Sequence, residues 1–182
     1  FNGTAWRNTG TVGEKPIALA VFDGKLYVGN QVSNDTYVYD GSSWSKSGDV
    51  GGAPQGMAVF NDKLYVANYA TDDVYVYDGA SWSKSGDVGV SPHSLVVFDD
   101  NLYVSCQAGS VWVLDGESWS KVANVGVSPK GMAVYKDKLY LVSYGSDEVY
   151  VYNGSVWTKS GDVGTKPYGL VTYGDKLYVN TI

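Results

Sequence analysis

The sequence contains few of the residues that hydrolytic enzymes and metal sites commonly use. It has a single histidine, His93, and a single cysteine, Cys106. One histidine and one cysteine do not make a zinc site by themselves, and no GxSxG segment occurs that would indicate a serine hydrolase. Cys106 has no partner for an internal disulfide and is predicted to be a small buried hydrophobe. We therefore expect a protein that is not an enzyme and that holds no metal and no cofactor.

Basic residues and long apolar runs are also scarce. The 13 lysines and arginines are outnumbered by 19 aspartates and glutamates, which gives a formal net charge of −6. This balance argues against nucleic acid or an anionic membrane surface as a partner, because both attract basic patches. No apolar run approaches the roughly 20 residues that cross a bilayer, so no membrane insertion is expected. Phe1 already belongs to the repeat described below, so any targeting segment is expected to have been removed or never to have been part of this chain.

Aromatic residues and glycine are abundant, and they recur with a fixed period. The 16 tyrosines, 6 tryptophans and 23 glycines are typical of an all-β protein with tight turns. Tryptophan recurs at intervals of 38, 38, 37 and 38 residues, as do all five prolines and a leucine that precedes a tyrosine: Trp6, Trp44, Trp82, Trp119 and Trp157; Pro16, Pro54, Pro92, Pro129 and Pro167; Leu26, Leu64, Leu102, Leu139 and Leu177. The three markers share one register. The sequence therefore predicts a single domain over residues 1–182, made of five repeats that start at residues 1, 39, 77, 114 and 152.

Each repeat has the pattern of four short strands. In the repeat that starts at residue 39, the apolar run at 56–60 is the first expected strand, and further strands are expected at 63–68, 74–77 and 81–85. Asp78-Gly79 between the last two is a strong hairpin signal. Four antiparallel strands per repeat form one blade of a β-propeller, so we predict five four-stranded blades. The repeated tryptophans are expected to be mostly buried between neighbouring blades.

The segment Pro54–Gly79 (PQGMAVFNDKLYVANYATDDVYVYDG) resembles repeats of the YVTN and NHL class of propellers. The DGxSW segments are similar to the outer strand of kelch-type or tachylectin-like propellers. The resemblance implies a propeller fold and display outside the cell or on its surface. These families include lectins, protein-binding modules, surface-layer proteins and a few enzymes, so the fold alone does not decide the function.

The repeat is incomplete where the two chain ends would meet. Ile182 aligns with Tyr69 and Phe1 aligns with Tyr77, so most of one third strand has no counterpart. The closing blade is therefore predicted to be incomplete, with strand edges that invite pairing. We expect a segment of another copy, residues absent from this sequence, or an inward shift of Thr4–Thr9 to fill this position.

One end of the propeller is the better candidate for binding. The loops after the second and fourth strands of each blade are longer than the hairpins at the opposite end, and their residues differ between repeats. Polar side chains beside tyrosines suit sugars, although the same variation is expected of loops without a function. The candidate ligand-binding residues are Gln55, His93, Lys130 and Tyr168 after the prolines, and Asn30, Gln31, Asn68, Tyr69, Gln107 and Tyr144 after the second strands.

Two further features of the loops have an ordinary explanation. Asp72-Asp73 and Asp147-Glu148 lack the spacing of a calcium loop and are expected to be solvated loop tips. Glycosylation sequons begin at Asn2, Asn34 and Asn153. Two of them replace the Asp-Gly hairpin, whereas Asn34 lies in a polar loop and is expected to be accessible.

Three functions are consistent with this pattern. The first is an extracellular, non-enzymatic recognition module that binds a glycan or a protein through the long-loop face. The second is a structural protein that assembles with other copies of itself, as a surface layer or filament, through the incomplete blade. The third is a propeller lyase or hydrolase, which a deep axial pocket with His93 and Lys130 converging would favour.

Overall fold

The computed structural model describes residues 3–182, in which all regular structure is β-strand and no helix occurs. No segment of this range therefore forms a helix long and apolar enough to cross a membrane. The first strands of the repeats are β1 (Pro16–Phe22), β5 (Pro54–Phe60), β9 (Pro92–Phe98), β13 (Pro129–Tyr135) and β17 (Pro167–Tyr173). The second strands are β2 (Lys25–Asn30), β6 (Lys63–Asn68), β10 (Asn101–Cys106), β14 (Lys138–Ser143) and β18 (Lys176–Thr181). The third strands are β3 (Asp35–Tyr39), β7 (Asp73–Tyr77), β11 (Ser110–Asp115) and β15 (Glu148–Tyr152). The fourth strands are β4 (Trp44–Asp49), β8 (Trp82–Asp87), β12 (Ser118–Asn124) and β16 (Trp157–Asp162).

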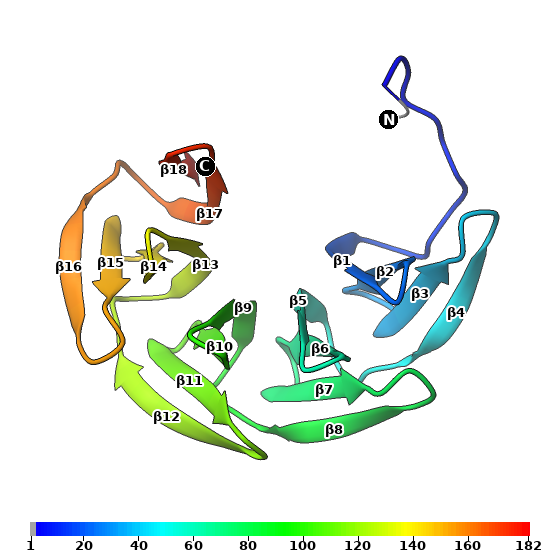
Figure 1. Ribbon diagram of the computed structural model, residues 1–182, viewed down its shortest axis with the longest axis horizontal. Coiled ribbons are helices and arrows are strands. Elements are labelled where there is room, and N and C mark those ends of the chain that lie inside the picture. Colours follow the sequence, from blue (N-terminus) through cyan, green and yellow to red (C-terminus); the bar gives the residue numbers. More distant parts are fainter. Residues whose placement is uncertain (1–2) are drawn as a thin grey trace.

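These strands form four complete blades and part of a fifth. Each complete blade is a sheet of four antiparallel strands in chain order, and the fifth sheet contains only β17 and β18. In Figure 1 the blades follow one another along an open arc, with the first strands on the inside and the fourth strands on the outside. The predicted propeller blades and the incomplete closing blade are confirmed.

The arc stays open between β1 and β18. Residues 3–15 contain no strand, and in Figure 1 the N-terminal segment leaves the arc on the side of the opening away from the C-terminus. The predicted inward shift of Thr4–Thr9 onto the last strand is therefore wrong for this chain. Completion by another copy, or by residues absent from this sequence, stays a prediction.

The core lies within and between the blades. The leucine of the Leu-Tyr pair is fully buried in the three central blades, at Leu64, Leu102 and Leu139. At the two ends of the arc, apolar side chains lie uncovered: Leu19 of β1 is 63% exposed, whereas its equivalent Leu95 in the central blade is 8% exposed. Blade-to-blade contact is therefore what buries the apolar faces of each sheet.

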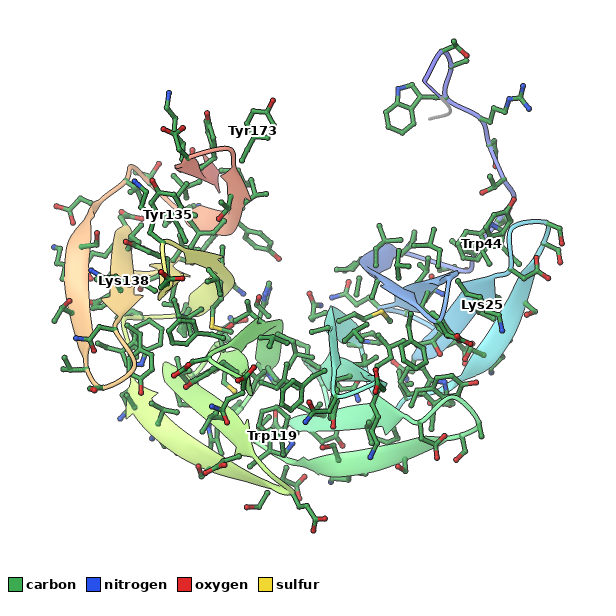
Figure 2. The ribbon with its side chains drawn as sticks, in the orientation of Figure 1. Lys25, Trp44, Trp119, Tyr135, Lys138 and Tyr173 are labelled. Carbon is green, nitrogen blue, oxygen red and sulfur yellow. The ribbon has the colours of Figure 1, made fainter. Side chains whose placement is uncertain are left out.

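The tryptophans of the fourth strands join neighbouring blades along the outer rim. Trp82 packs over Gly48 of the preceding blade, where an added Cβ would lie 2.5 Å from the indole Cδ1. Its indole Nε1 donates a hydrogen bond to Ser47 Oγ at 3.0 Å. We call this contact the tryptophan latch. It recurs between Trp119 and Ser85, and between Trp44 and Thr9; Figure 2 shows Trp119 at the junction of the second and third blades.

The tryptophans are less buried than the sequence predicts. The four from Trp44 to Trp157 are half-buried. Three of the indoles cover the outer strand of the preceding blade from the rim, and that of Trp44 covers Thr9 and Gly10 of the N-terminal segment. Trp6 is 85% exposed, since residues 3–15 are not part of a blade. The expectation of tryptophans between blades holds for three of the five, Trp82, Trp119 and Trp157, because Trp44 contacts Thr9 in the strandless N-terminal segment. The expectation of nearly complete burial is wrong.

The acidic residues and Asn34 of the long loops hold turns together. The Asp72 carboxylate accepts a hydrogen bond from Ser91 N–H at 2.7 Å. Asn34 occupies the equivalent position, is half-buried and accepts from Ala53 N–H at 2.8 Å. Asp73 is only 5% exposed. The expected solvated tips and the expected accessibility of Asn34 are therefore wrong. Asp72 and Asn34 satisfy backbone groups of the next loop, and Asp73 accepts hydrogen bonds from the side chains of Asn68 and Thr71.

The other two sequons have different positions. Asn153 is exposed, and its side-chain oxygen accepts hydrogen bonds from Ser155 and Val156 N–H in the hairpin, each at 3.0 Å. Asn2 lies outside the described residues. Use of any of the three sequons stays a prediction.

Candidate functional site

The long-loop face of the arc contains a pocket of about 460 Å³ at its axis. Two positions of every repeat line it. The first position is the residue that follows the proline of the first strand, and the second position is the residue that directly follows the second strand. The lining residues are Ile17, Gln55, His93, Lys130 and Tyr168 at the first position, Gln31, Tyr69, Gln107, Tyr144 and Ile182 at the second, and Ser128. The whole length of the chain therefore contributes to one site.

The first position points into the pocket because it is the site of a β-bulge. In β5, Pro54 pairs with Asn68 and Gly56 pairs with Ala67, so Gln55 is an extra residue without a ladder partner. The register shifts at the same place in the other four repeats. A bulge bends its strand and turns the extra side chain away from the alternation of the sheet. Five bulges therefore aim five side chains at the axis.

The second position is tied by a backbone hydrogen bond to the residue that lies two places before the first position. Gln107 N–H donates to Ser91 C=O at 2.9 Å, and Tyr144 N–H donates to Ser128 C=O at 3.1 Å. The acceptor residue directly precedes the proline, and its φ is near +54° in both cases. This left-handed conformation is uncommon for serine, and it recurs in all five repeats, at Lys15, Ala53, Ser91, Ser128 and Lys166.

Glycines after the bulge let the inner strands approach each other. A Cβ added to Gly56 would lie 2.6 Å from the carbonyl oxygen of His93, and one added to Gly131 would lie 2.8 Å from the Cα of Gly169. These neighbours are backbone atoms, which have little freedom to move aside. The glycines therefore allow the close packing that gathers the pocket residues at the axis.

His93 is the most perturbed titratable group of the pocket. It is 8% exposed, and its Nε2 lies 3.2 Å from the hydroxyl of Tyr168. Burial, together with the charge of Lys130, lowers the pKa of His93 to about 4. The imidazole is therefore neutral at neutral pH, with one ring nitrogen as donor and the other as acceptor.

Lys130 lies beside His93 and brings a positive charge to the pocket. Its side chain is mostly covered, since the residue is 7% exposed. Nζ donates to Gln107 Oε1 at 2.8 Å and lies 5.8 and 5.6 Å from the ring centroids of Tyr144 and Tyr168. Burial lowers the pKa of Lys130. The two rings face the ammonium in cation–π geometry, which holds it at the wall of the pocket.

Eight of the ten predicted ligand-binding residues line this pocket, and two do not. Asn30 and Asn68 are fully buried, and the Asn68 amide donates to Val50 C=O and to Asp73 Oδ1, the latter at 3.0 Å. They are structural residues, so their prediction as pocket residues is wrong. Ile17, Ser128 and Ile182 line the pocket without having been predicted; Ile17 and Ile182 occupy the two repeat positions that define it, which is the signal that identifies them. Ligand binding by the eight stays a prediction.

Within residues 3–182, the side chains do not form a group of three or more histidines, cysteines, aspartates and glutamates suited to a metal. Cys106 is fully buried in the core between blades, as predicted, and burial raises the pKa of its thiol to about 12. A thiol with that pKa is protonated at neutral pH and therefore a poor nucleophile. His93 and Lys130 remain the chemically distinctive pair.

The sequence of the chain matches one family. The family model described as "DUF6242 beta propeller domain" matches residues 53–173, about two thirds of the chain. No curated protein matches.

Solved propellers resemble the chain in fold. A catalytically inactive histidine-to-alanine variant of virginiamycin B lyase from Staphylococcus aureus, with quinupristin, superposes with a TM-score of 0.80 at 14% identity over 92% of this chain and 63% of that one. A nidogen/laminin complex gives a TM-score of 0.73 at 20% identity over 91% and 72%. A putative gluconolactonase gives 0.76 at 15% identity over 95% and 73%. The chain thus spans less than two thirds of the length of the lyase chain, and at these identities the likeness concerns the fold alone.

Proposed function

Because the chain belongs to the DUF6242 beta propeller domain family, which is described by its fold, we propose its function from the pocket: it is a recognition module that binds a small hydroxylated ligand, with sugars as the preferred class. One observation carries the proposal. Each repeat directs two side chains into a single pocket, and the combination of the two is different in every repeat while the surrounding framework is not.

The chemistry of the lining supports a sugar. Gln31, Gln55 and Gln107 supply amide groups that both donate and accept hydrogen bonds. Tyr69 and Tyr144 add flat apolar rings with a polar tip, which suit the apolar face of a pyranose. A volume of about 460 Å³ lies within the usual range of small-molecule pockets.

The test is a titration of ¹⁵N-labelled protein with a panel of monosaccharides and disaccharides, followed by NMR. We expect shifts that concentrate on pocket residues. Tyr69→Ala should weaken the binding about tenfold or more, whereas Tyr173→Ala, which removes an exposed tyrosine at the open end of the arc (Figure 2), should leave it unchanged. Absence of shifts at millimolar sugar, or shifts confined to the outer rim, would contradict the proposal.

Catalysis is the second candidate, because His93 and Lys130 converge in the axial pocket. A neutral histidine beside a buried lysine can move protons to and from a bound ligand. The lyase that shares the fold is inactive as a histidine-to-alanine variant. An enzyme would lose turnover in His93→Ala while still binding its ligand. A recognition module would show no turnover of a bound sugar in either form.

The proposal also includes a location and two further kinds of partner. An extracellular or cell-surface location follows only from the resemblance of the repeats. A protein is the alternative ligand, and the nidogen structure shows a relative in fold in complex with a protein partner. Assembly with other copies would use the edge of β18, which has no third strand beside it in the described part of the chain.

A further inference from the structure

Lys130 differs from three of the four lysines of the outer strands. Lys46, Lys84 and Lys159 project from the rim, and each forms an ion pair with a carboxylate, at 2.6, 2.5 and 2.7 Å for the shorter contact. Lys130 is far more buried, and its hydrogen-bond acceptor is the neutral amide oxygen of Gln107. A buried ammonium without a carboxylate beside it is costly to the fold.

The surroundings of Lys130 also lack negative charge. No aspartate or glutamate is among the residues that line the pocket in the described range 3–182. The other lining side chains are uncharged amides, tyrosines, isoleucines, a serine and a histidine that is neutral above a pH of about 4 because burial lowers its pKa. In a chain with a formal charge of −6, the pocket is a positively charged position.

The ammonium retains capacity for a ligand. A lysine has three N–H donors, and Gln107 Oε1 takes one of them. The rings of Tyr144 and Tyr168 stabilise the cation without neutralising it. Charge-assisted hydrogen bonds to a carboxylate are shorter and stronger than those to a hydroxyl, so an anionic group would meet the remaining donors best.

We propose that the ligand of this pocket is a hydroxylated molecule that carries a carboxylate, as an acidic sugar does, and that Lys130 pairs with that carboxylate. The inference rests on the proposed function, since it assigns the charge of the ligand that the pocket binds. The glutamines and tyrosines contact the hydroxyl groups and the ring of the ligand. Lys130 makes the affinity for an acidic sugar higher than that for its neutral counterpart.

The test compares glucuronate with glucose, which differ at one carbon, by calorimetric or NMR titration of the whole chain. We expect glucuronate to bind about tenfold tighter or more, and this preference to weaken with added NaCl, whereas binding of glucose should not change with salt. Lys130→Met should abolish the preference, and Lys130→Arg should retain it. Lys138→Met is the control, because it removes the same charge from an exposed side chain at a distant hairpin.

The outcomes separate this inference from the proposed function. Equal binding of glucose and glucuronate would overturn the carboxylate while leaving a sugar pocket intact. Failure of every sugar to bind would overturn the proposed function itself. Inorganic phosphate that binds more tightly than glucuronate would show a general anion site and would also overturn the inference. The melting temperature of Lys130→Met should equal or exceed that of the wild type, because the substitution removes a buried charge; if this variant does not fold, Lys130→Arg and the salt series still decide.

Discussion

The outer strands use nearly the same side chains in every blade, whereas the inner strands place a different side chain at the pocket position of each blade. At the rim, Trp82 contacts Ser47 and Trp119 contacts Ser85 in the same way. At the axis, five equivalent bulge positions carry five different residues. The difference follows from the geometry. A latch residue must fit the neighbouring blade, while the side chain of a bulge residue leaves the ladder and faces the pocket, so the fold does not dictate its identity.

The largest effect is expected from removing a latch. Trp82→Ala should lower the free energy of unfolding by about 3 kcal/mol, at the lower end of the range for buried aromatics because the indole is half-buried. Gln55→Ala, at a pocket position, should change it by less than about 0.5 kcal/mol. Urea denaturation of both variants measures the contrast. A cost for Gln55→Ala as large as that of Trp82→Ala would break the comparison.

His93 is the pocket residue at which stability should depend on pH. Its folded pKa of about 4 lies below the ordinary histidine value of 6.5, because burial disfavours the charged imidazole, so the folded state binds its proton less readily than the unfolded state. The contribution of the neutral imidazole to the free energy of unfolding is fully present above pH 6.5. It is lost as the pH falls from 6.5 towards 4, and the total loss is about 3 kcal/mol.

The matched measurement compares the wild type with His93→Gln. Protonation of carboxylates also destabilises the protein in acid, but it affects both proteins alike, so the difference between their unfolding free energies isolates the histidine. This difference should change between pH 6.5 and 4 and stay constant above 7. A difference that is independent of pH would show that the imidazole titrates normally and is more solvated than its 8% exposure indicates.

The repeat made most of the fold and much of the site predictable from the sequence. Once the five prolines set the register, the residue after each one fell at an equivalent place, and equivalent places in a propeller converge on its axis. Asn68 was misassigned because adjacent residues of a strand point to opposite sides, and the sequence does not reveal which side faces inward at a strand end. The turn role of Asp72 needed the position of Ser91, 19 residues away. Completion of the fifth blade needs strands that residues 3–182 do not supply, so this sequence does not determine whether the arc closes.

One tryptophan of the outer rim, Trp157, lacks the hydrogen bond of the tryptophan latch. Trp157 occupies the same position in the fourth blade, but Val122 stands where Ser47 and Ser85 accept the indole hydrogen bond in the preceding pairs. The Nε1 of Trp157 is buried and has no acceptor among the described residues. An unsatisfied buried donor costs about 1–3 kcal/mol.

Val122→Thr should therefore raise the free energy of unfolding by about 0.5–1 kcal/mol. Threonine keeps the shape and strand preference of valine and supplies the missing hydroxyl, and Thr9 already accepts the indole hydrogen bond of Trp44 at 3.1 Å. The gain should disappear in a Trp157→Phe background, because phenylalanine has no N–H group to donate to the hydroxyl. Val96→Thr is a second control at another half-buried site, and it should be destabilising. Urea denaturation of the double-mutant cycle measures the coupling. A gain that persists with phenylalanine at position 157 would show that the hydroxyl acts elsewhere and that the latch hydrogen bond does not contribute to stability.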